Sequence, residues 1–238
     1  WAWTRVNCGL MLLFMKQILF LFAFSFLLSA CGGGKPETLE VELDARPVES
    51  IYNEAAALMD AGEYARAAAI FNEVERQHPY SQWATRAQLM AAYGYYEDQN
   101  FDEAILALDR FIRLHPGYRD IDYAYYLMAL SHYHQITDVR RDQEMTSRAL
   151  QSFDDLLARF PDSRYARDAT LKRDLTLDHL AGKEMDIGRY YLKQGHFNAA
   201  IPRFMEVVKT YDTTTHVPEA LHRMVEAYLA LGLKGEVE

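Results

Sequence analysis

The sequence predicts an all-α protein, built as an α-solenoid of about five irregular helical hairpins. Composition is ordinary for a globular chain, with 50% hydrophobic and 25% charged residues. The prediction rests on a recurring spacing, in which an alanine precedes a large apolar residue by four positions and a proline by twelve. The successive copies are Ala67, Phe71 and Pro79; Ala104, Leu108 and Pro116; Ala149, Phe153 and Pro161; and Ala200 and Phe204, with Asp212 in place of the proline.

This spacing has a direct physical interpretation. An alanine lets two helices approach closely, and the residue four positions later lies on the same helix face, one turn on. The proline ends one helix and starts the next. The pattern resembles the tetratricopeptide repeat, whose period is 34 residues, and this resemblance implies a right-handed solenoid. The alanines here are 37, 45 and 51 residues apart, so we expect insertions at Thr137–Thr146 and in an extra helical stretch between Pro161 and Lys183.

A second signature follows two of the prolines. Ser81-Gln82-Trp83-Ala84 and Ser163-Arg164-Tyr165-Ala166 each place a helix-capping serine before an aromatic residue that packs on the previous hairpin. We assign N-terminal repeats to residues 50–136 and C-terminal repeats to 137–238. A fifth unit begins at Val217 without a second helix. Since a solenoid normally closes with a capping helix, a truncated chain is expected.

The N-terminal segment is typical of a secretory signal. Met15-Lys16 is followed by an apolar core and then by small residues before Cys31. Leu28-Ser29-Ala30-Cys31 resembles the lipobox of bacterial lipoproteins, in which the cysteine is acylated. We therefore expect a signal peptide over residues 1–30, with 1–14 as an over-extended start, and a lipid on Cys31. The alternative is a membrane-spanning anchor over Leu10–Ala30, which is long enough but is interrupted by Lys16.

Residues 31–49 are expected to form a flexible tether behind the lipid. They contain three glycines, two prolines and five acids, with no apolar period. In lipoproteins of this type an aspartate after the cysteine marks inner-membrane retention. Gly32 stands there instead, so the resemblance implies the outer membrane.

Several classes of function are disfavoured by the sequence. A net charge of -9 argues against nucleic acid as a partner. Two cysteines cannot build a disulfide framework, and no zinc spacing is present. His132 and His134 are two residues apart and point to different faces of a helix. With no HExxH, no G-x-S-x-G and no P-loop in the sequence, we expect no catalytic site, no metal site and no cofactor.

Tyrosine is abundant, with 16 residues, and many fall on the first helices of the predicted hairpins. Such helices line the concave face of a solenoid, where tyrosines and an arginine suit an extended peptide that carries aromatic side chains. The alternative is that these residues only pack neighbouring hairpins together. The residues predicted to face inward are Arg86, Leu89, Tyr93, Tyr96, Tyr123, Tyr126 and Tyr133.

The lipobox, the acidic tether and the irregular hairpins together resemble the BamD family of the β-barrel assembly machinery. The motifs that carry the resemblance are Leu28–Cys31, Tyr52-Asn53-Glu54-Ala55, Gly62-Glu63-Tyr64-Ala65-Arg66-Ala67, Phe160–Ala166, and Arg189-Tyr190-Tyr191 with Gly195. The resemblance implies a non-catalytic scaffold, anchored by lipid to the outer membrane and facing the periplasm. It also implies partners for the two ends of the solenoid.

The C-terminal repeats would bind BamA through the POTRA domain nearest its barrel. The expected contact region comprises Arg189, Tyr190, Gln194 and His222. The N-terminal repeats would serve other assembly lipoproteins and the C-terminal segments of unfolded outer-membrane proteins, which end in aromatic residues. Two alternatives stay open at this point. One is another periplasmic scaffold lipoprotein, for envelope constriction or polysaccharide export. The other is the helical part of a lytic transglycosylase, which would require a catalytic domain beyond Glu238.

Overall fold

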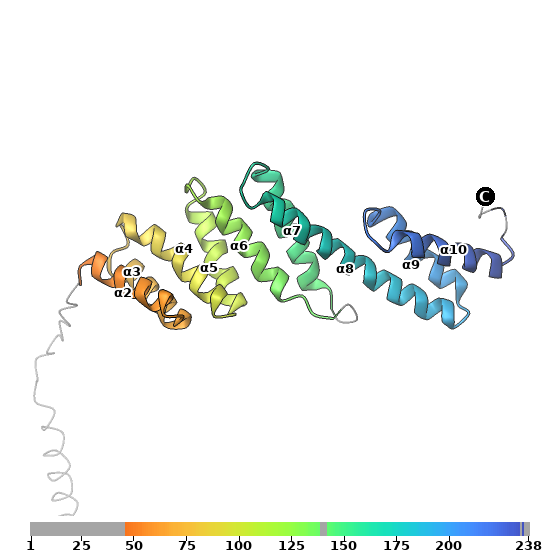
Figure 1. Ribbon diagram of the computed structural model, residues 1–238, viewed down its shortest axis with the longest axis horizontal. Helices are drawn as coiled ribbons and strands as arrows, with labels where there is room; N and C mark the ends of the chain where they lie inside the picture. Colours follow the sequence, from red (N-terminus) through yellow and green to blue (C-terminus); the bar gives the residue numbers. More distant parts are fainter. Residues whose placement is uncertain (1–45, 139–141, 234, 236–238) are drawn as a thin grey trace, which may run out of the picture. The chain divides into compact units, whose positions relative to one another are not determined.

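The computed structural model describes residues 46–138, 142–233 and 235. The expected signal peptide, Cys31 and almost all of the expected tether lie outside these ranges. The described residues form nine α-helices and no strand (Figure 1). The helices are α2 (Val48–Asp60), α3 (Tyr64–Gln77), α4 (Gln82–Glu97), α5 (Phe101–Leu114), α6 (Ile121–His134), α7 (Glu144–Arg159), α8 (Ala166–Lys193), α9 (Phe197–Thr210) and α10 (Val217–Ala230).

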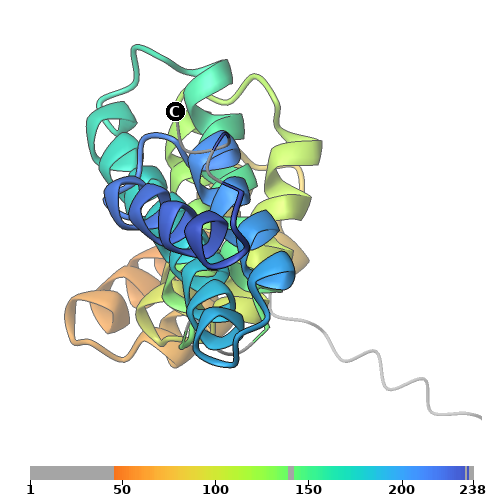
Figure 2. The same cartoon turned by 90° about the vertical axis from the view of Figure 1, so that its right-hand side faces the viewer.

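The helices pair into hairpins along the chain, which confirms the all-α solenoid. The pairs are α2 with α3, α4 with α5, α6 with α7 and the end of α8 with α9, and α10 begins a fifth unit. Each hairpin also packs against the next, and the first helices of neighbouring hairpins touch one another. In Figure 2 the dark-blue α10 lies nearest the viewer, packed against α8 and α9.

The repeated alanine and the large apolar residue after it lie in the core of every hairpin. Both are fully buried at each of the four copies, as the close approach of two helices requires. The second helix of each hairpin then ends in the same way. The residue after it has φ between −119° and −134°, and its N–H donates to the carbonyl four residues earlier; these residues are His78, His115, Phe160 and Tyr211.

The turn that follows a first helix is also repeated, after α2, α4, α8 and α10 but not after α6, where Gln135 has φ of −88°. In the repeated turn the helix is followed by a residue in the left-handed region, and the next amide donates to a carbonyl five residues earlier, for example from Glu63 to Leu58 at 2.9 Å. The left-handed residues are Gly62, Gln99, Gly195 and Gly232, with φ of +76°, +61°, +78° and +78°. Gln99 is the exception, because a side chain occupies a position where the other turns use glycine.

The extra helical stretch expected between Pro161 and Lys183 is present as part of α8, which runs without a break over 28 residues because no proline interrupts it and its buried face persists. Two other expectations about element boundaries need correction. The expected insertion Thr137–Thr146 is shorter, since α7 already begins at Glu144. Ser81 caps α4 by accepting from the amide of Ala84 at 3.1 Å. Ser163 instead donates to Asp122 at 2.6 Å, and α8 begins three residues later.

Candidate peptide-binding face

Four tyrosines, from the first helices α4 and α6 and from the start of α8, form a continuous row. Tyr93 of α4 lies 6.5 Å from Tyr123 of α6, measured between ring centroids. Tyr123 lies 5.4 Å from Tyr165, just before α8, and Tyr165 stacks on Tyr126 at 4.7 Å. All four side chains are half-buried. This set, here called the tyrosine row, therefore both joins the hairpins and remains partly accessible.

Carboxylates flank the row at both ends. The hydroxyl of Tyr126 donates to Asp168 at 2.5 Å, and Lys172 donates to the same carboxylate at 2.8 Å. Burial opposes ionisation of Asp168, but these hydrogen bonds prevail and hold its pKa below the usual value. At the other end, burial and then a hydrogen bond with Glu97 raise the pKa of Tyr93 to about 12.

Burial also raises the pKa of Tyr123 and, together with the Asp168 contact, that of Tyr126. Tyr93, Tyr123 and Tyr126 are therefore neutral across the physiological pH range, with the ionised carboxylate of Asp168 beside Tyr126. Such a surface can stack with aromatic rings and can exchange hydrogen bonds with a peptide backbone.

The other predicted residues divide between surface and core. Arg86 is exposed, and its guanidinium lies 5.5 Å from the ring centroid of Tyr52. Tyr96 contacts His134, with 3.1 Å between its hydroxyl and the ring nitrogen. Tyr133 packs edge-on against the core residue Phe153 at 6.0 Å. Leu89 departs from the expectation: only 7% of it is exposed, because α5 and α6 cover it.

Sequence reasoning missed Tyr165 and Asp168 as members of this surface. Tyr165 was assigned to packing because it belongs to the serine–aromatic signature, and it does pack. The same ring nevertheless completes the row. Asp168 lies three residues further, on the first turn of α8, and nothing local in the sequence marks it as the partner of Tyr126.

The predicted C-terminal contact region lies on α8, α10 and the turn after α8. Arg189 makes two hydrogen bonds with Glu219, at 3.0 and 2.5 Å, and so ties α8 to α10. Tyr190 is 61% exposed, and Gln194 and His222 are exposed as well. A shallow cavity of about 280 Å³ adjoins Arg189 and is lined also by Leu192, Lys193, Arg223 and Glu226.

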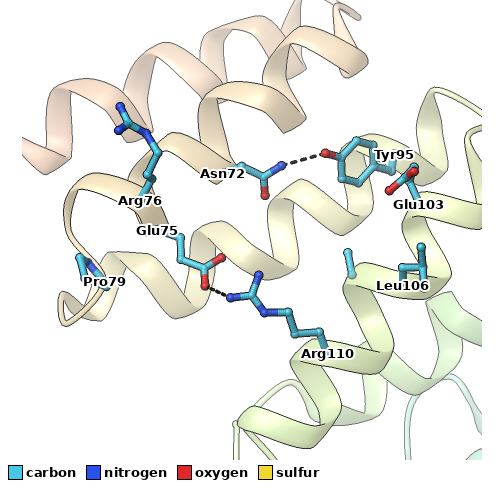
Figure 3. A pocket seen from close by; sticks show the side chains of 9 residues that line it. Asn72, Glu75, Arg76, Pro79, Tyr95, Glu103, Leu106 and Arg110 are labelled. Carbon is cyan, nitrogen blue, oxygen red and sulfur yellow. Dashed lines mark hydrogen bonds and ion pairs between the residues drawn. The ribbon is translucent and has the colours of Figure 1, made fainter.

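A separate groove lies on the second helices, away from the tyrosine row. Figure 3 shows Arg110 of α5 paired with Glu75 of α3, and Asn72 donating to the hydroxyl of Tyr95 at 2.8 Å. The groove encloses about 560 Å³ and is lined by a mixture of charged, polar and apolar side chains, Leu106 among them. The ion pair between Arg110 and Glu75 lies at the surface, where such pairs contribute about 0–1 kcal/mol to stability. We therefore interpret the groove as the packing boundary between two neighbouring hairpins.

Two further searches cover only the described ranges. No helix there is both long and apolar enough to span a membrane. No group of three histidine, cysteine or acidic residues within them is placed to hold a metal ion. His132 is buried in α6, and the pKa of its imidazole is lowered by burial.

Comparison with known proteins agrees with this architecture. The YfiO family, described as outer membrane lipoprotein, matches residues 44–238. The outer membrane protein assembly factor BamD of Caulobacter vibrioides is 48% identical over 205 residues, which cover 86% of this chain and 67% of that protein. This chain belongs to the BamD family. BamD of Rickettsia prowazekii is 47% identical over 81% of this chain and 76% of that protein. BamD of Neisseria meningitidis serogroup A is 35% identical, with 92% and 86% covered.

Proposed function

We propose that this protein is a non-catalytic scaffold lipoprotein of outer-membrane β-barrel assembly. The BamD relatives are named as outer membrane protein assembly factors, and the described fold is a solenoid of the kind that serves as a binding surface. An acyl group on Cys31 anchors the chain to the outer membrane, and residues 31–49 hold the solenoid in the periplasm. Its work is binding, with no covalent step.

The tyrosine row is the observation that carries this proposal. An unfolded outer-membrane protein segment that ends in an aromatic residue stacks that ring on the row. The hydroxyl groups and flanking carboxylates exchange hydrogen bonds with its backbone. Arg86 lies two helical turns before Tyr93 and is exposed, so it can pair with the terminal carboxylate of the segment. Holding the segment beside the insertion site raises its effective concentration there.

The C-terminal repeats supply the second contact, to the POTRA domain of BamA nearest its barrel. Tyr190, Gln194 and His222 are exposed in the C-terminal repeats and are available to a partner. Arg189 is held by Glu219, which fixes the surface around them. Other assembly lipoproteins would bind the N-terminal repeats.

A peptide-binding measurement tests the first contact. The full chain in detergent is titrated against a labelled peptide that ends in phenylalanine with a free carboxylate, and fluorescence anisotropy gives the Kd. Arg86→Ala is expected to weaken binding about tenfold, the loss typical of a charge-assisted contact. Amidation of the peptide terminus should produce the same loss in the parent protein and none in the variant.

Arg113→Ala is the matched control, because Arg113 is an exposed arginine on the second helix α5, where it pairs with Asp109. Equal affinities of the parent chain, Arg86→Ala and Arg113→Ala would overturn the assignment of the terminal carboxylate to Arg86. Failure of the parent chain to bind the peptide would overturn the tyrosine row as a peptide site.

The BamA contact is tested by copurification from detergent-solubilised outer membrane. Tyr190→Ala is expected to reduce recovery of BamA at least several-fold, since exposed tyrosines are common interface anchors. Tyr80→Ala is the control: Tyr80 is fully exposed, but lies in the N-terminal repeats. If no BamA copurifies with the parent protein, the scaffold belongs to another envelope system.

A further inference from the structure

The long helix α8 contains two copies of the first-helix pattern, one after the other. Ser163-Arg164-Tyr165-Ala166 matches Ser81-Gln82-Trp83-Ala84 before α4, which places Leu171 at the position of Leu89 and Leu175 at that of Tyr93. Tyr191 and the turn glycine Gly195 match Tyr95 and Gln99 at the end of α4. That second alignment places Met185 at the position of Leu89. The two copies are 14 residues apart, about four helical turns, so they use the same face of α8.

In the copies on α4 and on the second half of α8, this face is covered by the second helix of the same hairpin and by the first helix of the next hairpin. Leu89 is buried in a cluster with Ile121 and Ala124 of α6. Met185 is fully buried in a cluster with Ala220 of α10. In both places the occupant is an α-helix that presents small or apolar side chains.

The first half of α8 lacks such a cover in the described structure. Leu171 and Leu175 are 59% and 58% exposed, although the equivalent Leu89 is 7% exposed. This difference arises because α8 is continuous. The helices α9 and α10 pack against α8 about four turns after Leu171, so neither of them covers Leu171. His179 continues the same line at a spacing of four residues.

A cavity adjoins this line of residues. It encloses about 270 Å³ between the end of α6 and α8, and is lined by Tyr133, His134, Ile136, Leu175 and His179. The Nδ1 atom of His179 is buried and has no hydrogen-bond partner among the described residues. A buried polar atom without a partner is unfavourable, and a ligand that supplies one would relieve it.

We propose that this line of residues, Leu171, Leu175 and His179, binds one amphipathic α-helix of a partner protein. The occupant is helical because helices fill the same position twice elsewhere in this chain. It carries large apolar side chains three or four residues apart, one of which enters the cavity beside Leu175. It also carries a basic residue beside them, because the exposed Asp174 stands where α4 has the buried Ala92 and makes only a long, 3.4 Å contact with Arg173.

The site is independent of the proposed function, since it uses neither the tyrosine row nor the C-terminal contact region. Site-specific crosslinking in cells tests it on the full chain. Benzoylphenylalanine replaces Leu171 or Leu175 in separate variants, and the crosslinked segment is identified by mass spectrometry. Leu114, 56% exposed at the end of α5, is the matched control position. Both α8 positions are expected to crosslink to one segment with the stated apolar spacing and basic residue, whereas position 114 does not.

A synthetic peptide of the crosslinked segment then gives the quantitative test. It is expected to become helical on binding, and Leu175→Gln should weaken its affinity about tenfold, as loss of one buried leucine contact predicts. Leu114→Gln should leave the affinity unchanged. The proposal is overturned if crosslinking at 171 does not exceed that at 114, or if it reaches only lipid or a second copy of this chain. A segment that binds in extended form, or equal affinity after Leu175→Gln, would also overturn it.

Discussion

Gly188 shows how a single residue sets the distance between two helices. It is buried in α8, and a Cβ built on it would lie 2.5 Å from the ring of Phe204 in α9. Gly188→Ala therefore forces the ring or the helix to move. We expect a loss of about 2 kcal/mol in the free energy of unfolding, the usual range for overpacking a core. Urea denaturation measures it.

Gly117→Ala is the control for that substitution. Gly117 lies between α5 and α6, and a Cβ there meets no atom within 4 Å. The free energy of unfolding of Gly117→Ala should stay within about 0.5 kcal/mol of the parent value. Equal effects of the two substitutions would show that α9 can shift to accommodate a methyl group, and that the contact with Phe204 is not limiting.

His132 makes stability depend on pH. Its imidazole is buried in α6 and has a lowered pKa, chiefly from burial and then from the charge of Arg148, against a smaller opposing effect of Asp102. The unfolded state, with an ordinary histidine pKa of about 6.5, thus binds the proton more readily than the folded state. This contribution favours folding above that pH and is lost progressively as the pH falls below it.

We therefore expect the urea concentration at the unfolding midpoint to be lower at pH 5.5 than at pH 7.5. The decrease should be smaller in His132→Leu. His222→Leu, which changes an exposed histidine of α10, should keep the parent slope. An unchanged slope in His132→Leu would mean that other groups account for the acid sensitivity.

The turn between α4 and α5 provides a test at the level of the element. Gln99 adopts φ of +61° where Gly62 and Gly195 occupy the equivalent turns. A side chain in this region is strained by roughly 1–2 kcal/mol. Gln99→Gly should therefore stabilise the protein by about 0.5–1 kcal/mol after allowance for the added freedom of the unfolded chain.

The reciprocal substitution Gly62→Gln should destabilise the chain by a similar amount, and thermal unfolding of the two variants makes the comparison. If Gln99→Gly were destabilising, the side chain of Gln99 would have to make contacts that outweigh its backbone strain.

The sequence predicts the repeated elements well because their signals are local. An alanine and a large residue four positions apart share one helix face, and a proline ends the helix, so Ala67, Phe71 and Pro79 define α3 without reference to the rest of the chain. The continuity of α8 could not be read in this way. No proline separates its two halves, and a helix that belongs to two successive hairpins has the same local pattern as two helices.

The candidate site was predictable in part, for a related reason. The sequence places Tyr93 and Tyr126 on first helices, and the structure brings both into the tyrosine row. Exposure, however, depends on which helix lies alongside. Leu89 and Leu171 occupy equivalent places in their local patterns, yet Leu89 is buried by α5 and α6 whereas Leu171 is exposed.

At the scale of the whole solenoid, stability is built from contacts between neighbours. Among the described helices each packs on the next, and the first helices of adjacent hairpins touch. The pair α6 and α7 meets the pair α9 and α10 only through α8. In such an architecture a local loss of packing is expected to spread to adjacent hairpins and to fade beyond them.

Phe71 and Phe204 provide a matched test of this behaviour, because both are fully buried and occupy the same repeat position in α3 and α9. Changing either residue to alanine should lower the local free energy of unfolding by about 3–5 kcal/mol. By hydrogen exchange, Phe204→Ala should lower the protection of α9, α10 and the second half of α8 while α3 and α4 keep theirs. Phe71→Ala should do the reverse. A uniform fall in protection along the chain in both variants would mean that α8 couples the hairpins into one cooperative unit.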